Sequence, residues 1–442
     1  MPPDSRAPSL GLAACTAIVI GNMVGSGFYL SPAAVAPYGL LGIVFWLVMG
    51  AGALCLGLTF ARLARRMPAT GGPYAYTRAA YGDFAGFIVA WGYWISIWAS
   101  LPVIAAAFTG SVIDLVPALR GNRPAGIGIT LGAMWLVAFT NLRGVKEAGF
   151  VAEVTTYAKL VPFAAIALLG LPFVHVSHFA VFNPSGQSLL TASAALAPLT
   201  MFAYLGLESA TVPAGDVRDP ERTIPRSTIL GISVATVLYV FGTTVVLGVV
   251  PREQLVTSIA PFADAARAMW GGWAAGVVAV AVMISSIGAL NGWTLLMGQV
   301  PMAAAKDTLF PEIFGRVSSR QVPAIGIMLS SALATGLVLV QTSGGPGFAA
   351  AYTMLVSLAT MTAVIPYVFC SLADGLISTR AGALPRIGVV EIVAFLFAVF
   401  TVYGCGPAPV LWGLLLLLFG IPVYVWQRHE RADAPVAAHR TR

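Results

Sequence analysis

The sequence is poor in charged residues, which make up only 9% of its 442 residues, whereas a soluble globular protein carries about 25%. Hydrophobic residues make up 58%, and the mean hydropathy is +0.87. This composition excludes a soluble domain with a water-facing surface. Apolar runs of about 20 residues recur, and the ten-residue alternation typical of a transmembrane β-barrel is missing. We therefore predict an all-α integral membrane protein.

Sequence signatures of catalysis and of cofactor binding are also lacking. The four cysteines show no CxxC spacing and lie in or beside apolar stretches, where cysteine serves as a small packing residue. The four histidines form no metal-binding pattern. The sequence contains no GxxxxGK[ST] or GxGxxG motif, which argues against an ATP-driven pump. We expect no cofactor and no enzymatic activity.

The apolar segments predict about twelve membrane spans, at about 20 residues for each crossing. Their ranges are 10–35, 39–62, 85–113, 126–142, 150–172, 190–214, 228–250, 272–303, 323–341, 349–374, 387–404 and 408–427.

The Lys and Arg residues are distributed unevenly between the two sides of these spans. With the N-terminus in the cytoplasm, only four of the 24 fall on the outer side, and Lys159 falls within a span. The outer four are Arg120, Arg123, Arg252 and Arg267. The positive-inside rule therefore predicts a multi-pass protein of the inner (plasma) membrane with both termini cytoplasmic. This distribution explains the net charge of +7 without a nucleic-acid partner.

The stretch GNMVGSGFYLSP (21–32) places three glycines, Asn22 and Ser26 within the first predicted span. Glycine in a helix interior costs about 1 kcal/mol relative to alanine, so this stretch favours a broken helix. In hydrocarbon, freed backbone groups are tolerated only where they line a cavity or a ligand. The N-terminus of a half-helix would offer N–H donors to a carboxylate. Close helix packing through small residues is the alternative, although such motifs space these residues by four.

A second stretch, LGLESATVPA (205–214), repeats the spacing of VGSGFYLSPA (24–33), with Pro-Ala seven and eight residues after a glycine. The two copies lie five spans apart, and an odd offset gives them opposite orientations in the membrane. This pattern predicts an inverted repeat of five plus five helices, with discontinuous helices 1 and 6. Coincidence in a Gly- and Ala-rich chain is the alternative. Within a single domain (1–442), we expect repeats at 10–172 and 190–374, two additional helices at 387–427 and a tail at 428–442.

Four ionisable residues fall inside predicted spans, namely Glu153, Lys159, Glu208 and Glu391. Such residues are energetically costly in a membrane and are functional candidates by default. Glu208 follows the glycine of the second break, where it could pair with a cationic ligand, relay a proton or hold the half-helices together. Lys159 could satisfy freed backbone carbonyls, or its side chain could extend to the interface.

Two tryptophans are candidates for the walls of a site. Trp293 lies in the middle of its span and could stack on a ligand, although core packing explains it equally well. Trp98 belongs to the aromatic segment WGYWISIWAS (91–100), which is also typical of an interfacial belt.

Taken together, these segments resemble the amino acid–polyamine–organocation superfamily, in particular its basic amino acid/polyamine antiporter branch. The matching segments are GNMVGSGFYLSPA, GGPYAYTRAAYG, FAYLGLESATVPAGDVRDPERTIPRS, APFADAARA, GWTLLMGQ, AAAKDTLFPEIF and VIPY. They cover most of the chain from about residue 10 to residue 370. The resemblance implies alternating access around a central substrate site, and it suggests a homodimer.

The resemblance also implies roles for individual residues. It places substrate-binding groups at Met23, Ser26, Gly27, Ser96, Ile97, Leu101, Ile104, Phe202, Leu205, Trp293 and Ala359. It places gating or coupling groups at Tyr74, Tyr93, Trp98, Lys159, Glu208 and Tyr367. Within the substrate-binding group, the Met23–Gly27 segment would hold the substrate carboxylate. The other residues of this group would hold the rest of the substrate.

Three positions depart from the arginine–agmatine antiporters of this branch, which have Trp at Phe202, asparagine at Leu101 and serine at Ala359. These changes remove polar groups that would satisfy a guanidinium, and an unmet buried charge costs several kcal/mol. We therefore doubt that arginine is the substrate. Lys159 is a further departure, and it is similar to the fifth-span lysine of sodium-independent members of the superfamily.

We predict a secondary active transporter that exchanges an amino acid for a related amino acid or amine across the lipid bilayer. The alternative is a proton-coupled symporter, with Glu208 or Lys159 as the proton site. A channel would need a continuous polar lining, whereas the polar residues here cluster at one depth. An intramembrane enzyme would need a catalytic constellation that the spans lack.

Overall fold

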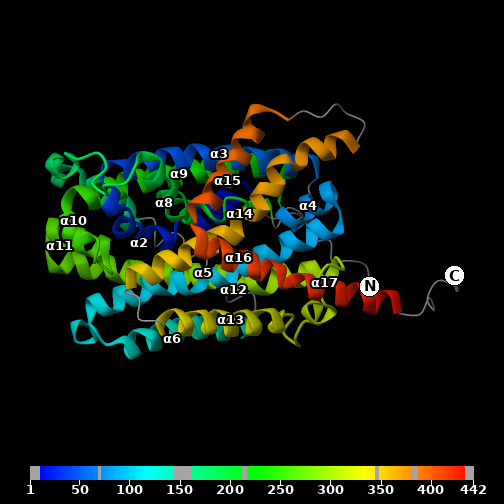
Figure 1. Ribbon diagram of the computed structural model, residues 1–442. Coiled ribbons are helices and arrows are strands. Elements are labelled where there is room, and N and C mark those ends of the chain that lie inside the picture. The colour runs from blue at the N-terminus through cyan, green and yellow to red at the C-terminus, as the bar shows by residue number, and fades with distance from the viewer. Residues whose placement is uncertain are drawn as a thin grey trace.

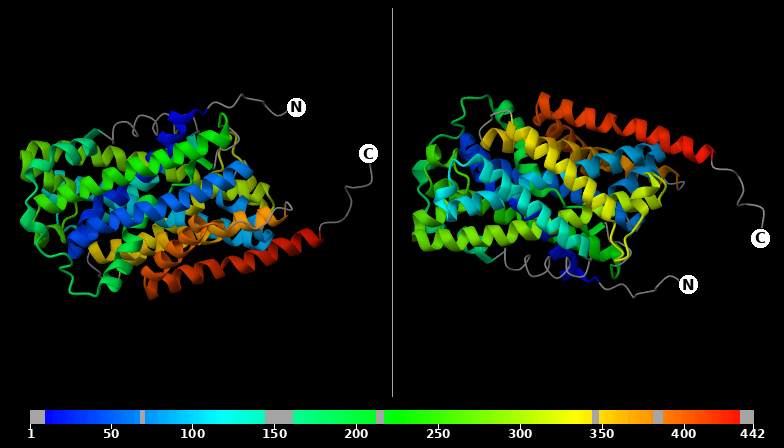
Figure 2. Two further views of the ribbon diagram at one scale, coloured as in Figure 1. Left: turned by 90° about the horizontal axis from the view of Figure 1, so that it is seen from above. Right: turned by 90° about the horizontal axis from the view of Figure 1, so that it is seen from below.

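The computed structural model describes residues 10–67, 71–143, 161–211, 217–343, 348–380 and 387–433. In these ranges, long helices lie side by side in an elongated bundle, and short helices and loops gather at its two ends (Figures 1 and 2). Helices α10 and α11 lie at one end, whereas α4 and the last turns of α17 lie at the other (Figure 1). The predicted outer and inner loops are therefore separated by the length of the bundle.

Sixteen α-helices have both ends within the described residues and form this bundle. They are α1 (Leu12–Met23), α2 (Ser26–Val35), α3 (Leu40–Arg66), α4 (Pro73–Tyr81), α5 (Asp83–Leu115), α6 (Arg123–Arg143), α8 (Leu189–Met201), α9 (Pro220–Val249), α10 (Arg252–Leu255), α11 (Pro261–Trp270), α12 (Gly272–Lys306), α13 (Ala324–Ser343), α14 (Phe348–Arg380), α15 (Val389–Gly404), α16 (Pro407–Leu418) and α17 (Gly420–Asp433). Residues 161–169 are also helical.

In the described ranges, nine helices are long and apolar enough to cross a membrane, and the bent pair α1–α2 makes a tenth. Helix α15 is a shorter apolar helix at the predicted eleventh span. These helices confirm the all-α membrane fold. The predicted span 150–172 is the remaining one, and residues 150–160 of it lie outside the described residues. Helix α17 continues to Asp433, into the segment that we predict as the tail.

The first predicted span is broken where its glycines fall. Helix α1 ends at Met23, helix α2 begins at Ser26, and the two axes are bent by 44°. Between them, Val24 has φ of −77° and ψ of 88°, and Gly25 is extended, with φ of −143° and ψ of −157°. The break falls where glycine lowers the helix propensity of the segment.

The sixth predicted span is broken as well. Helix α8 ends at Met201 and is followed by two short 3₁₀ turns, Phe202–Tyr204 and Ser209–Thr211. Gly206 between the turns has φ of +99°, a conformation that side-chain-bearing residues rarely adopt. The helix is therefore interrupted at the glycine of the second stretch. Residues 212–214 of the predicted span lie outside the described part of the chain.

The two breaks are in contact with each other. Asn22, at the end of α1, donates a hydrogen bond from Nδ2 to Oγ of Ser209 over 2.8 Å. A Cβ added to Gly206 would lie 2.9 Å from Cβ of Asn22, so glycine is also needed for this close approach. The similar stretches of the sequence thus meet in the interior of the bundle.

Two arginines of α3 bind carboxylates at the end of the bundle that holds α4. Arg62 pairs with Glu391, whose side chain is buried at the start of α15. Arg66 pairs with the buried Asp374 of α14 over 3.1 Å. Glu391, an ionisable residue to which the sequence assigns no role, therefore joins α15 to α3.

Candidate functional site

The start of α2 carries backbone donors without partners in the helix. The amide of Val24 donates to the carbonyl of Ile20 over 2.7 Å and so closes α1. The first paired amide of α2 is that of Phe28, which donates to the carbonyl of Gly25 over 3.1 Å. Among the described residues, no side chain caps this end of the helix. The amides of residues 25–27 thus face the break, at the positive end of the half-helix dipole.

A small cavity of about 20 Å³ lies against this helix start. That volume corresponds to about one water molecule, so the cavity has no room for an amino acid in this conformation. It lies among α1, the start of α2, α5, the break after α8 and α12, and the residues that line it are Asn22, Met23, Gly25, Gly27, Ile104, Phe202, Leu205, Ala289 and Trp293. The cavity is therefore formed by both helix breaks together with two unbroken helices.

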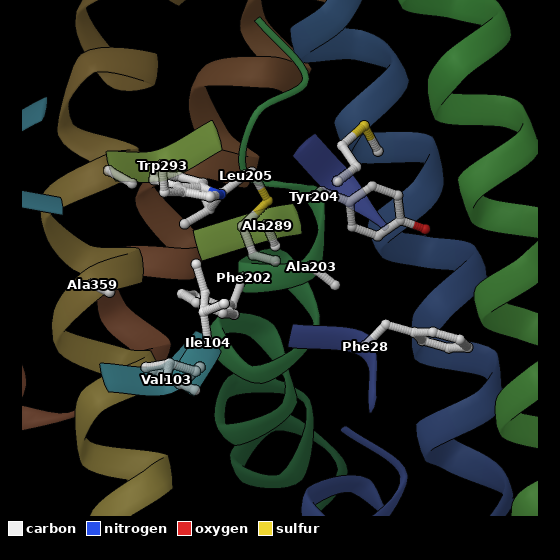
Figure 3. Close-up of a cluster of buried hydrophobic side chains, with 14 of the residues drawn as sticks. Phe28, Val103, Ile104, Phe202, Ala203, Tyr204, Leu205, Ala289, Trp293 and Ala359 are labelled. Carbon is white, nitrogen blue, oxygen red and sulfur yellow. The ribbon is translucent and has the colours of Figure 1, made fainter. Parts of the chain in front are cut away.

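The ring of Phe202 covers the start of α2. A Cβ added to Gly27 would lie 2.6 Å from Cδ1 of Phe202, which leaves no room for a side chain at this position. Figure 3 shows Trp293 and Leu205 on one side of Phe202, and Ile104 on the other. The Phe202 ring therefore fills the space beside Gly27 at the start of α2.

The structure brings together six of the residues predicted to bind substrate, namely Met23, Gly27, Ile104, Phe202, Leu205 and Trp293. Four other predicted residues are buried but do not line the cavity, namely Ser96, Ile97, Leu101 and Ala359. The hydroxyl of Ser96 donates to the carbonyl of Tyr93 over 2.7 Å, within α5. The Ser26 side chain lies outside the part of the chain that the structure describes.

Glu208 forms a buried polar cluster with two of the predicted gating tyrosines. Its Oε1 accepts a hydrogen bond from the hydroxyl of Tyr93 over 2.7 Å, and its Oε2 accepts one from Tyr367 over 2.5 Å. All three side chains are almost fully buried. This cluster joins the break after α8 to α5 and α14, which satisfies a carboxylate that would otherwise be unpaired.

The other predicted gating residues lie apart from this cluster. The hydroxyl of Tyr74, in α4, donates to Oδ2 of Asp307 over 2.9 Å, just after the end of α12. Burial and the nearby Asp307 carboxylate raise the pKa of Tyr74 above its usual value. Trp98 is buried, and its Nε1 has no partner among the described residues. Lys159 lies outside the described residues.

Three cavity-lining residues are missing from the predicted set, and one of them, Gly25, lies in the glycine-rich break itself. Asn22 belongs to the glycine-rich stretch, and its polar side chain within an apolar span was a usable signal. Ala289 lies in α12 one helical turn before Trp293, and nothing in its sequence surroundings marks it. A small residue at this position leaves space next to Gly25, since a Cβ on Gly25 would lie 3.4 Å from that of Ala289.

A helical membrane bundle with two broken helices around a closed interior cavity defines a membrane transport protein. The sequence matches the family model described as "Amino acid permease" over residues 10–423. The chain therefore belongs to the amino acid permease family, and it is a multi-pass inner-membrane transporter rather than an enzyme.

Several bacterial transporters are similar to the chain over nearly its whole length. The putrescine transporter PotE of Escherichia coli is 28% identical over 430 residues, covering 95% of this chain and 96% of PotE. The cadaverine/lysine antiporter of Escherichia coli is 31% identical over 405 residues, covering 91% and 88%. The arginine/ornithine antiporter of Pseudomonas aeruginosa is 31% identical over 441 residues, covering 95% and 91%. These relatives support the predicted antiporter branch.

Proposed function

We propose that this protein exchanges an amino acid for a related amino acid or amine, and that it binds the α-carboxylate at the start of α2. The observation that carries the proposal is the uncapped start of α2, which opens onto a buried cavity where the two helix breaks meet. Unpaired amides and the positive end of a helix dipole suit a carboxylate. The names of the relatives, two of them antiporters, support exchange.

The two breaks supply the joints for alternating access. In the proposed mechanism, the repeats 10–172 and 190–374 rock against each other around the site, with 387–427 as additional helices. The contact between Asn22 and Ser209 keeps the breaks together during this motion. Both termini lie in the cytoplasm, and two copies form a homodimer.

Two clusters act as gates in this mechanism. The cluster of Glu208, Tyr93 and Tyr367 joins three helices beside the break after α8, so its hydrogen bonds must change when these helices separate. The bond between Tyr74 and Asp307 closes the inner end in the same way. Lys159 is assigned to the support of freed backbone carbonyls, in line with the sequence resemblance.

The function is tested with purified protein in liposomes loaded with a mixture of unlabelled amino acids and diamines. We expect uptake of labelled amino acid only when the vesicles contain substrate. Uptake into empty vesicles that requires an inward proton gradient would instead establish proton symport. A Ser26→Lys variant should abolish binding, because it changes the segment that is proposed to hold the carboxylate, and unchanged affinity would refute this pocket.

A further inference from the structure

The wall of the cavity beyond the start of α2 is apolar. Ile104, Phe202, Leu205, Ala289 and Trp293 provide it, and Asn22 is the one polar side chain in the lining that the structure describes. The amide of Asn22 is engaged with Ser209 across the two breaks.

Four further apolar residues of α5 and α14 are buried. Ile97, Leu101, Val103 and Ala359 are buried with exposures of 0%. Figure 3 shows Val103 next to Ile104 on the side of Phe202 away from Trp293, and Ala359 to their left on another helix. An ammonium or guanidinium group placed against the cavity wall would meet no carboxylate among the described lining residues.

The buried carboxylates of the described residues are all engaged elsewhere. They are Glu208, Asp374 and Glu391. Both oxygens of Glu208 accept hydrogen bonds from tyrosine hydroxyls, as described above. Asp374 and Glu391 pair with arginines of α3, outside the cavity lining. None of the three lines the cavity, so no buried carboxylate of the described residues lies against the place proposed for the substrate side chain.

From this geometry we infer that the transported amino acid has an uncharged, apolar side chain, which lies against Ile104, Phe202 and Trp293. The inference rests on the proposed function, because it takes the start of α2 as the carboxylate site. An amino acid with such a side chain has no net charge and needs no counter-charge from the protein. Lysine, ornithine or a diamine would bury an unpaired cation, which is strongly unfavourable.

The position of Phe202 fits the same class of substrate. Its ring lies over Gly27, so it must move aside when a substrate reaches the amides of α2. An apolar side chain can then take up contacts that the ring makes in the closed site, with Ile104 on one side and Ala289 on the other. The Phe202 ring covers the apolar wall before substrate binds, and the substrate side chain covers it afterwards. Replacing one by the other therefore exposes no apolar surface to water.

The test is a substrate panel on the full chain in liposomes, with labelled leucine and labelled lysine measured separately. Vesicles are loaded with both unlabelled amino acids, and leucine, isoleucine, methionine, phenylalanine, lysine, ornithine, arginine and putrescine compete from outside. We expect the best apolar amino acid to compete at a concentration at least tenfold lower than any cationic compound. Equal or better competition by a cationic compound would overturn the inference.

A substitution in the wall gives a second, independent readout. Ile104→Asp places a carboxylate in the lining and should shift the ratio of lysine to leucine exchange by at least tenfold toward lysine. Val176→Asp, at a side chain that is 79% exposed and outside the cavity lining, is the matched control and should leave the ratio near that of the wild type. An unchanged ratio in Ile104→Asp would contradict the assignment of Ile104 to the side-chain wall. If that variant does not fold, Ile104→Glu provides the same comparison, and the wild-type panel still decides the substrate class.

The panel also separates this inference from the proposed function. Exchange of lysine without exchange of any apolar amino acid would retain the function and overturn the substrate class. Failure of both labels to exchange, in protein that is monodisperse and correctly folded, would overturn both.

Discussion

The ring of Phe202 occupies the space that a side chain at position 27 would need, because a Cβ on Gly27 would lie 2.6 Å from Cδ1 of the ring. This contact joins the start of α2 to the break that follows α8. Both broken helices therefore close the cavity, and a change at either residue should affect the site as a whole.

Replacing Gly27 with alanine should reduce exchange at least tenfold. The added methyl group would force the Phe202 ring into another position, and overpacking of this kind costs about 1–3 kcal/mol. The variant is compared with wild type in the liposome exchange assay and in thermal unfolding. Gly128→Ala in α6 is the matched control, since a Cβ there has nothing within 4 Å. Full exchange by Gly27→Ala would show that the ring does not control access.

The hydrogen bond between Asn22 and Ser209 should couple the two helix breaks. A double-mutant cycle with Asn22→Ala and Ser209→Ala should give a coupling free energy of about 1 kcal/mol in unfolding. Both single variants should also slow exchange, because the bond joins the segments that move. The pair Thr109 and Thr130, whose hydroxyls lie 2.8 Å apart, provides the control cycle, with coupling but normal exchange. Additive effects of the first two substitutions would argue against coupled breaks.

Removing one donor from the Glu208 cluster should impair the protein more than the loss of a surface hydroxyl. Tyr367→Phe leaves the buried carboxylate with one tyrosine donor fewer, at a cost of about 1–3 kcal/mol of stability. Exchange should fall as well, because this cluster joins the break after α8 to α5 and α14. Tyr403→Phe is the control, since the Tyr403 side chain is 67% exposed. Equal stability and activity in both variants would contradict a gating role for the cluster.

The pair of Arg62 and Glu391 should stabilise the contact between α3 and α15. Arg62→Ala leaves a buried carboxylate without its cation, and we expect a loss of about 1–3 kcal/mol, reduced by the partial exposure of Arg62. Arg222→Ala is the control, because its pair with Asp219 is exposed and 3.9 Å long. Thermal unfolding of the purified variants measures the difference. A similar melting temperature for both variants would show that the buried pair contributes little.

Hydropathy was enough to predict the long spans, because the apolar length of each helix is a local property of the sequence. The glycines at 25 and 27 likewise predicted the first break, since backbone freedom is local. The spacing of the first stretch, repeated around Gly206, predicted where the second break lies. The resemblance, and not these local features, predicted that Met23, Gly27 and Phe202 lie near one another.

Other features depend on contacts between distant parts of the chain. Glu391 pairs with Arg62, which lies 329 positions away in the sequence, so no local sequence pattern predicts this pair. Among the predicted residues of α5, Ile104 lines the cavity and Leu101 does not, although both are apolar and buried. Which side of a fully buried helix faces the cavity is set by packing on all its sides, so hydrophobic periodicity carries no signal for it.

The central claim is that the start of α2 recognises a substrate carboxylate, and binding to the purified wild-type protein tests it most directly. The affinity for the amino acid that exchanges best is compared by calorimetry with the affinity for its carboxamide, which has the same side chain and amino group but no negative charge. We predict at least tenfold weaker binding of the carboxamide. Equal affinities would contradict the account.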